Sequence, residues 1–112
     1  LSPEFTQIWE GKIINIHHAF LPAFQGANPY LRAYQRGVKM IGATAHYATE
    51  DLDKGPIIEQ DVVRVNHELS PTGLKEVGKD VEKRVLAKAV QAHLEHRIII
   101  HKNRTIVFTV ER

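Results

Sequence analysis

The sequence contains no cysteine. This absence excludes disulfide bonds, thiolate-bound zinc and a cysteine nucleophile, and it is typical of a protein of the reducing cytoplasm. Long apolar runs are lacking too, since no stretch approaches the roughly 18 residues that a membrane-spanning helix needs. The chain also does not open on a charged segment followed by an apolar one, as a secretory signal would. We therefore expect a cytoplasmic protein.

The sequence also has no large excess of positive or negative charge. The chain has 15 Lys and Arg against 13 Asp and Glu, a formal net charge of +2, which does not indicate a nucleic-acid surface. With 112 residues, 43% hydrophobic and 25% charged, it has the size and composition of one ordinary globular domain. It begins with Leu1 rather than methionine. We expect it to be a piece of a longer protein.

Strand and helix patterns alternate along the chain and predict an α/β fold. Segments rich in β-branched or alternating apolar residues predict strands at 12–16, 40–49, 57–65, 97–101 and 105–108. The link between the second and third strands is short, so we expect these two to pair antiparallel. In the strand at 40–49, Ile41, Ala43, Ala45 and Tyr47 should share one face, with Gly42, Thr44 and His46 on the other.

Two helices are predicted from their end signals. Asn28 and Pro29 suit the start of a helix that Gly37 would end. Ser70 and Pro71 suit the start of a longer one. Apolar residues recur at helical spacing along this second helix, at Leu74, Val77, Val81, Val85, Ala89 and Ala92. Its two glycines, Gly73 and Gly78, are expected to weaken its first turns slightly.

The first candidate for chemistry is the pair Asn15 and His17. Residues two apart in a strand project to the same side, so this amide and imidazole are predicted to point together at the strand's C-terminal end. The amide can stabilise negative charge that develops on an acyl oxygen, and the imidazole can act as acid or base near neutral pH. The alternative is that both are merely polar residues that finish a strand.

The second candidate is the acidic stretch of Glu50, Asp51 and Asp53. A carboxylate near His17 would favour its charged form, hold its orientation and position a water molecule. The alternative is a solvated surface turn, since Asp ahead of Gly-Pro is ordinary turn composition. Calcium is not expected, because the ligands are too few and the spacing lacks the loop signature.

Seven histidines raise the question of a metal site. His93 and His96 have permissive helical spacing, but no acidic third ligand accompanies them, so solvated helix histidines and no metal are expected. His46 lies mid-strand and is expected to be a core or pocket-wall histidine.

Two longer motifs resemble the signatures of a known family and occur in the same order as in that family. Residues 15–24, Asn-Ile-His-His-Ala-Phe-Leu-Pro-Ala-Phe, resemble the Asn-Ile-His and Leu-Pro signature of the folate-dependent formyltransferases. Residues 41–47 and 52–60 resemble that family's second signature, a His-aromatic pair followed by Leu-Asp-x-Gly-Pro-Ile-Ile. His18, where transferases usually have proline, and the tail segments 80–86 and 103–106 resemble the formyltetrahydrofolate deformylases within the family.

The resemblance implies hydrolysis of 10-formyltetrahydrofolate to tetrahydrofolate and formate, which supplies purine biosynthesis, without metal or prosthetic group. It implies three catalytic residues: Asn15 to bind the formyl oxygen, His17 to stabilise the oxyanion or carry a proton, and Asp53 to orient His17 and water. The pterin pocket would be lined by the loop Ala48, Thr49, Glu50, Asp51, Leu52 and Asp53, with His46 in a supporting role.

The resemblance also implies an architecture. Residues 1–112 would be the C-terminal half of a Rossmann-like formyltransferase domain, a partial mixed sheet with flanking helices. The first half of that catalytic domain and an N-terminal regulatory domain of the ACT type would be absent. Two alternatives stay open: another formyltransferase that passes the formyl group to an amine, and a non-catalytic folate-binding fragment. The expected partners are folate, water and further copies of the chain, with neither nucleic acid nor membrane.

The isolated 112-residue chain is expected to be weakly active or inactive and to be dimeric or larger. A half-sheet lacks part of the folate pocket and leaves an open strand edge, which invites self-association. A formate-release assay and a molar mass from light scattering test both expectations. Full deformylase activity at the monomer mass would contradict them.

Overall fold

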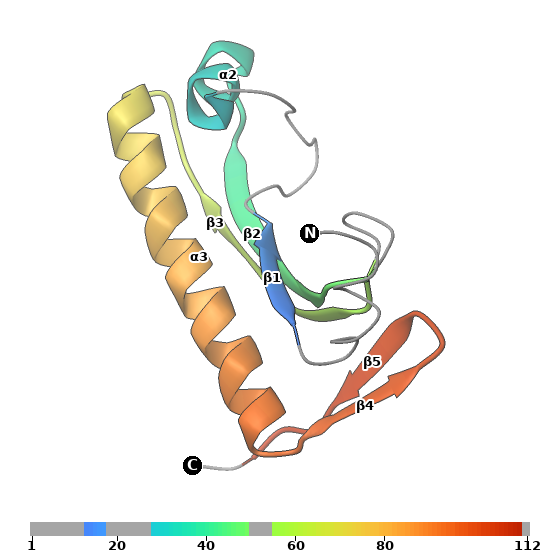
Figure 1. Cartoon of the computed structure of the whole chain (residues 1–112). Helices are drawn as coiled ribbons and strands as arrows, with labels where there is room; N and C mark the ends of the chain where they lie inside the picture. The colour runs from blue at the N-terminus through green and yellow to red at the C-terminus, as the bar shows by residue number, and fades with distance from the viewer. Residues whose placement is uncertain (1–12, 18–27, 50–54, 111–112) are drawn as a thin grey trace.

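The structure, a computed structural model, describes residues 13–17, 28–49 and 55–110 (Figure 1). The elements follow in the order β1 (Ile14–His17), α2 (Pro29–Arg36), β2 (Met40–Tyr47), β3 (Ile57–Arg64), α3 (Pro71–Leu94), β4 (Ile98–His101) and β5 (Arg104–Val107). Every element predicted over these residues is present. In this part of the chain, no helix is long and apolar enough to cross a membrane.

The main sheet has the order β1-β2-β3 and is antiparallel wherever the structure describes it. The predicted antiparallel pairing of β2 with β3 is confirmed. The register shifts at one point: Ala45 faces Glu59 and His46 faces Ile57, which leaves Ile58 as the extra residue of a bulge in β3. Strands packed with helices in this way are those of a partial α/β domain, as predicted.

Helix α3 lies along one face of this sheet (Figure 1). Its predicted apolar face is confirmed: Val77 is half-buried and packs against the core beside Leu74, and the other predicted residues are buried. The core between helix and sheet is formed by Ala43, Ala45, Tyr47, Ile58, Val81, Val85 and Ala89. The odd-numbered residues of β2 therefore point to α3, as their alternation predicted, and the even-numbered residues point to the opposite face.

The helix ends follow the predicted signals with one exception. The Ser70 hydroxyl accepts a hydrogen bond from the Gly73 amide at 3.1 Å, which caps α3. Gly37 ends α2 with a left-handed φ of 73°. Asn28 precedes α2 as expected, but it does not cap the helix as asparagine commonly does, because it has a φ of 62° and its side chain makes no capping hydrogen bond.

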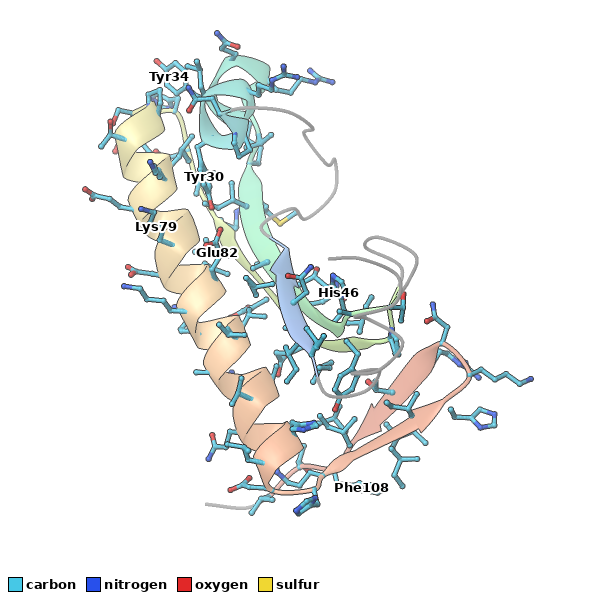
Figure 2. The ribbon with its side chains drawn as sticks, viewed as in Figure 1. Tyr30, Tyr34, His46, Lys79, Glu82 and Phe108 are labelled. Carbon is cyan, nitrogen blue, oxygen red and sulfur yellow. The ribbon has the colours of Figure 1, made fainter. Side chains whose placement is uncertain are left out.

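Gly78 sets the contact between the two helices. A Cβ at this position would lie 2.1 Å from the Tyr30 hydroxyl oxygen, so only glycine lets the tyrosine ring of α2 pack onto α3. The Tyr30 hydroxyl then donates a hydrogen bond to the Glu82 carboxylate at 3.0 Å (Figure 2). The expectation that Gly78 only weakens the helix is therefore corrected: it is the space into which Tyr30 fits.

Tyr47 joins the far end of β2 to α3. Its hydroxyl lies 2.8 Å from Nδ1 of His93, and the two rings meet edge to face with centroids 5.7 Å apart. The description of His93 as a solvated helix histidine is wrong, because this side chain is partly buried and bonded to the end of the sheet. Burial raises the pKa of the Tyr47 phenol.

Strands β4 and β5 form a separate two-stranded hairpin beyond the end of α3. Ile98 and Val107 on its inner face pack against the main core. The Thr105 hydroxyl donates a hydrogen bond to the carbonyl oxygen of Ile57, which attaches β5 to the start of β3.

Gly78→Ala tests the close approach of the helices. Alanine gains helix propensity but its methyl group would overlap the Tyr30 ring, so we expect a net loss of about 1–3 kcal/mol in the free energy of unfolding. Urea denaturation measures this loss. Gly73→Ala in the same helix is the control, because its Cβ meets only the flexible end of Leu69, at 3.3 Å, and the cap oxygen of Ser70, at 3.5 Å. Equal stability for the two variants would show that the contact is not tight.

An alkaline titration tests the burial of the two bonded tyrosines. Burial raises the pKa of Tyr30, and the charge and hydrogen bonding of the Glu82 carboxylate raise it further. Because the pKa values of Tyr30 and Tyr47 are higher in the folded than in the unfolded chain, their stabilisation is complete below about pH 10 and is lost as the pH rises above it. Absorbance at 295 nm, followed with circular dichroism, should show both phenols ionising late and together with unfolding. The variants Tyr30→Phe and Tyr47→Phe assign the late transitions, because each variant lacks the transition of the tyrosine that it replaces. Ionisation of both phenols near pH 10 while the chain stays folded would contradict the expectation.

Candidate active site

The pairing of β1 with β2 brings the first candidate residues to one face of the sheet. Asn15 faces His46 directly, and His17 faces Thr44. Residues directly opposite each other in antiparallel strands lie on the same face, so all four positions share the face opposite α3. Ile14 and Ile16, which alternate with them along β1, pack against the core on the α3 side. The register thus puts Asn15 and His17 at positions of one face, two residues apart in β1, and their joint role in chemistry stays a prediction.

His46 is buried on this face, with 4% of its surface exposed (Figure 2). Its Nδ1 lies 3.0 Å from the carbonyl oxygen of Tyr47. A carbonyl oxygen can only accept a hydrogen bond, so Nδ1 carries the proton, and in the neutral imidazole Nε2 holds the lone pair. The backbone of β2 thus selects one tautomer of His46. Its burial agrees with the expectation of a core or pocket-wall histidine.

Thr44 is a second buried polar group on the same face and was not among the predicted site residues. It is 8% exposed, and its hydroxyl accepts a hydrogen bond from the side-chain amide of Gln60 at 3.0 Å. Gln60 lies directly opposite it in β3. The signal that could have found Thr44 is its spacing of two residues from His46 in an otherwise apolar strand.

The chain after β2 is held to β1. Ala48 is buried, and its amide donates a hydrogen bond to the carbonyl oxygen of Ile13 at 2.8 Å. Thr49 follows it and is half-buried. These are the two predicted pocket residues that the structure describes beyond β2. The remaining ones, Glu50, Asp51, Leu52 and Asp53, lie outside the described residues.

Gly55 brings the returning chain against the end of β2. A Cβ there would lie 1.6 Å from the Tyr47 carbonyl oxygen and 3.3 Å from Nδ1 of His46. The next residue, Pro56, accepts a hydrogen bond from the Tyr47 amide at 3.0 Å. The described chain therefore resumes at Gly55 against the end of β2, and Asp53 precedes Gly55 by two residues in the sequence.

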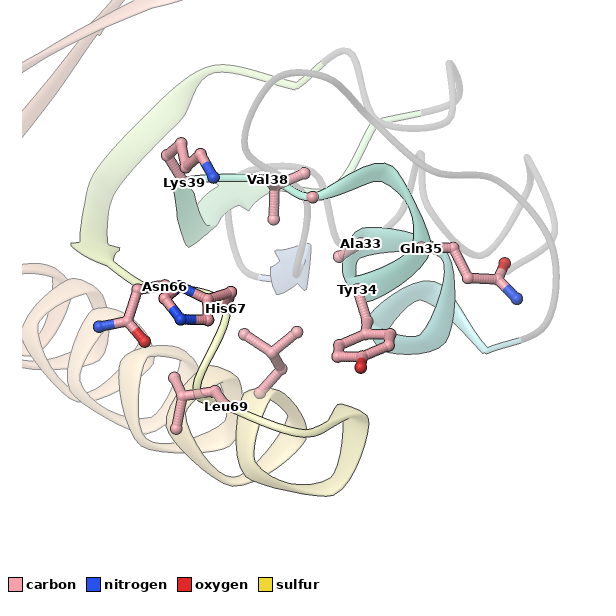
Figure 3. Close-up of a pocket in the computed structure, with 10 residues that line it drawn as sticks. Ala33, Tyr34, Gln35, Val38, Lys39, Asn66, His67 and Leu69 are labelled. Carbon is pink, nitrogen blue, oxygen red and sulfur yellow. The ribbon is translucent and has the colours of Figure 1, made fainter.

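A pocket of about 300 Å³ lies elsewhere, between the end of α2 and the link from β3 to α3 (Figure 3). Its lining includes Tyr34, Lys39, His67 and Leu74. Lys39 precedes the start of β2, whereas His46 lies at the strand's other end, so this pocket is separate from the candidate site.

The described side chains give no support for a metal centre. Within residues 13–17, 28–49 and 55–110, no group of three or more potential ligands lies close enough to hold an ion. His93 bonds Tyr47, and His96 lies beyond the end of α3 with a left-handed φ of 57°.

Comparison with known proteins agrees with the two sequence motifs. A family model described as formyl transferase matches residues 1–90. The formyltetrahydrofolate deformylase of Bacillus subtilis is 61% identical over 108 residues, which cover 96% of this chain and 36% of that protein. The deformylase of Synechocystis sp. is 67% identical over 96 residues, covering 86% of this chain and 34% of that protein.

A solved structure agrees as well. The crystal structure of formyltetrahydrofolate deformylase from Burkholderia mallei superposes with a TM-score of 0.93 at 55% identity, over 97% of this chain and 39% of that one. The chain thus spans little more than a third of the length of the relatives it matches. With the matching motifs, family model and fold, the chain belongs to the formyl transferase family.

Proposed function

We propose that this chain supplies the folate-facing part of an active site that hydrolyses 10-formyltetrahydrofolate to tetrahydrofolate and formate. The observation that carries the proposal is the β1–β2 register, which sets Asn15 opposite His46 and His17 opposite Thr44. The similarity to proteins named as deformylases supports hydrolysis as the reaction.

In this proposal, Asn15 and His17 act on the formyl group itself. Water adds to the formyl carbon, the bond from that carbon to N10 breaks, and a proton from water ends on N10, which leaves formic acid and tetrahydrofolate. The Asn15 amide donates to the formyl oxygen, where negative charge grows as water adds. His17 stabilises that oxyanion or carries the proton to the leaving nitrogen.

Asp53 is proposed to orient His17 and the attacking water. The close approach of Gly55 to the Tyr47 carbonyl oxygen supports this role, because Gly55 follows Asp53 by two residues and lies at the end of β2. The loop residues Glu50, Asp51 and Leu52, with Ala48 and Thr49, are proposed to line the pterin pocket. The anchoring of Ala48 to Ile13 supports a fixed near wall for that pocket.

His46 has a different role from His17 in this proposal. Its Nδ1 proton is engaged by the Tyr47 carbonyl oxygen, so the neutral ring presents Nε2 as an acceptor. An acceptor suits an N–H or O–H group of substrate or water and does not suit an oxyanion. His46 is therefore proposed as a supporting group, while oxyanion stabilisation stays with Asn15 and His17.

We also propose that the chain is part of a longer protein, because its relatives are about three times as long. The chain is taken as the C-terminal part of a catalytic domain, whose first half and regulatory ACT-type domain would belong to the longer protein. The substrate partners are folate and water, without a prosthetic group, and self-association is expected. The cytoplasm is proposed as its place, and a chain without cysteine is compatible with that reducing compartment.

Asn15→Ala tests the proposal in a protein with a complete site. The 108 matched residues of the Bacillus subtilis deformylase are replaced by those of this chain, and formate release from 10-formyltetrahydrofolate is measured. We expect the chimera to hydrolyse the substrate and Asn15→Ala to lower kcat by about 10²–10³-fold, since one preorganised oxyanion donor is lost.

Asn103→Ala is the matched control, since it makes the same chemical change in the exposed turn of the β4–β5 hairpin and should leave kcat unchanged. An unchanged rate in Asn15→Ala would refute the assigned role. Transfer of the formyl group to added glycinamide ribonucleotide would favour a transferase. Folate binding by a folded chimera without formate release would favour a binding module.

A further inference from the structure

Tyr47, at the end of β2, is held by each of its polar groups. Its amide donates a hydrogen bond to the Pro56 carbonyl oxygen at 3.0 Å. Its carbonyl oxygen accepts the Nδ1 proton of His46, also at 3.0 Å. Its hydroxyl lies 2.8 Å from Nδ1 of His93 in α3. With 3% of its surface exposed, this residue joins β2, the start of β3 and the end of α3.

The carbonyl oxygen of Tyr47 acts on the proposed active site in two ways. It selects the tautomer of His46, because it can only accept a hydrogen bond. It is also the atom against which Gly55 packs, and Gly55 follows Asp53 by two residues. A shift of the backbone at Tyr47 would therefore disturb the imidazole of His46 and the chain that leads back to Asp53.

The side chain of Tyr47 crosses to the other face of the sheet, where α3 lies (Figure 1). There its ring belongs to the core that includes Val85 and Ala89, and it meets the half-buried ring of His93 edge to face, with centroids 5.7 Å apart. The phenol and the imidazole nitrogen can each donate or accept, so either tautomer of His93 can form the bond. The orientation of the tyrosine ring is thus set from the helix.

We propose that His93 is a positioning residue for the active site, which acts through Tyr47 from the opposite side of the sheet. The bond to His93 fixes the phenol, the fixed ring holds the backbone of Tyr47, and the carbonyl oxygen there orients His46. Small displacements of catalytic groups by remote changes can lower a rate strongly. This inference deepens the proposed hydrolysis: its kinetic test rests on that function, and its spectroscopic test does not.

His93→Leu and Tyr47→Phe test the proposal in the chimera with the Bacillus subtilis deformylase, because each removes the same hydrogen bond from a different side. Each should lower kcat by about 10–100-fold, with KM changed by less than about twofold. The double variant should be no slower than the slower single variant, since the bond can be lost only once. His93→Asn, whose amide group can take the place of Nδ1, should restore most of kcat.

His67→Leu is the matched control, since it makes the same chemical change in the exposed link between β3 and α3 and should leave kcat unchanged. Circular dichroism at the assay temperature shows that each variant is folded. A loss of kcat in His93→Leu that Tyr47→Phe does not share would overturn the proposal. Losses that add in the double variant would overturn it as well, because two independent effects would then be present.

Nuclear magnetic resonance of the chimera, labelled with ¹⁵N in its histidines, tests the same link without activity. The ring signals of His46 are assigned by their loss in His46→Gln. The unaltered chimera should show a neutral ring with the proton on Nδ1. His93→Leu and Tyr47→Phe should add the form with the proton on Nε2, and His67→Leu should not.

An unchanged His46 tautomer in both His93→Leu and Tyr47→Phe would overturn the proposal, whatever the rate of hydrolysis. A chimera that binds folate but releases no formate would contradict the proposed function instead. In that case the ring signals of His46 decide this inference by themselves.

Discussion

The packing of α3 against one face of the β1–β2–β3 sheet determines which residues are left for chemistry. Ala43, Ala45 and Tyr47 of β2 enter the core with Val81 and Val85. Because side chains alternate along a strand, this commitment turns Thr44 and His46 to the opposite face. The β1 register then brings Asn15 and His17 to that face as well. The candidate site is thus a consequence of which face α3 covers.

Two glycines hold this arrangement at its ends. Gly78 lets Tyr30 pack into α3, which fixes α2 ahead of β2, and Gly55 lets the returning chain press against the Tyr47 carbonyl. A methyl group at either position would overlap a neighbour, so both contacts depend on a missing Cβ rather than on an added attraction. The Tyr47–His93 contact ties the same end of β2 to α3. The strand with the candidate groups is therefore fixed at its two ends and along one face.

Much of the fold could be predicted from local patterns. The alternation in β2, the helical spacing from Leu74 to Ala92 and the end signals Ser70 and Gly37 each depend on nearby residues, and the structure agrees with them. Contacts between distant residues could not be predicted in this way. Tyr30 and Glu82 are 52 residues apart, and nothing near Gly78 indicates the ring that fills its space.

The candidate site likewise has features that local patterns predict and features that depend on contacts between distant residues. The placement of Asn15 and His17 on one side of a strand follows from a two-residue period, and the family motifs indicated their chemistry. The bond from Gln60 to Thr44 depends on the pairing of β2 with β3, whose register shifts at the adjacent bulge, and no local pattern sets that register. The tautomer of His46 depends on the position of the Tyr47 carbonyl oxygen, which no sequence pattern indicates.

Thr44 and His46 are polar side chains buried on the face opposite α3, and they depend on the sheet for hydrogen-bond partners. A polar side chain withdrawn from water destabilises the fold unless it finds a hydrogen-bond partner, and an apolar residue at the same position would need none. Here each group has a partner drawn from the sheet itself: Gln60 for Thr44, and the Tyr47 carbonyl for His46. These bonds hold the two side chains in single orientations opposite His17 and Asn15. An apolar pair at positions 44 and 46 would need neither bond, so the hydrogen bonds from β2 and β3 are what allow this face to keep polar groups for the proposed hydrolysis.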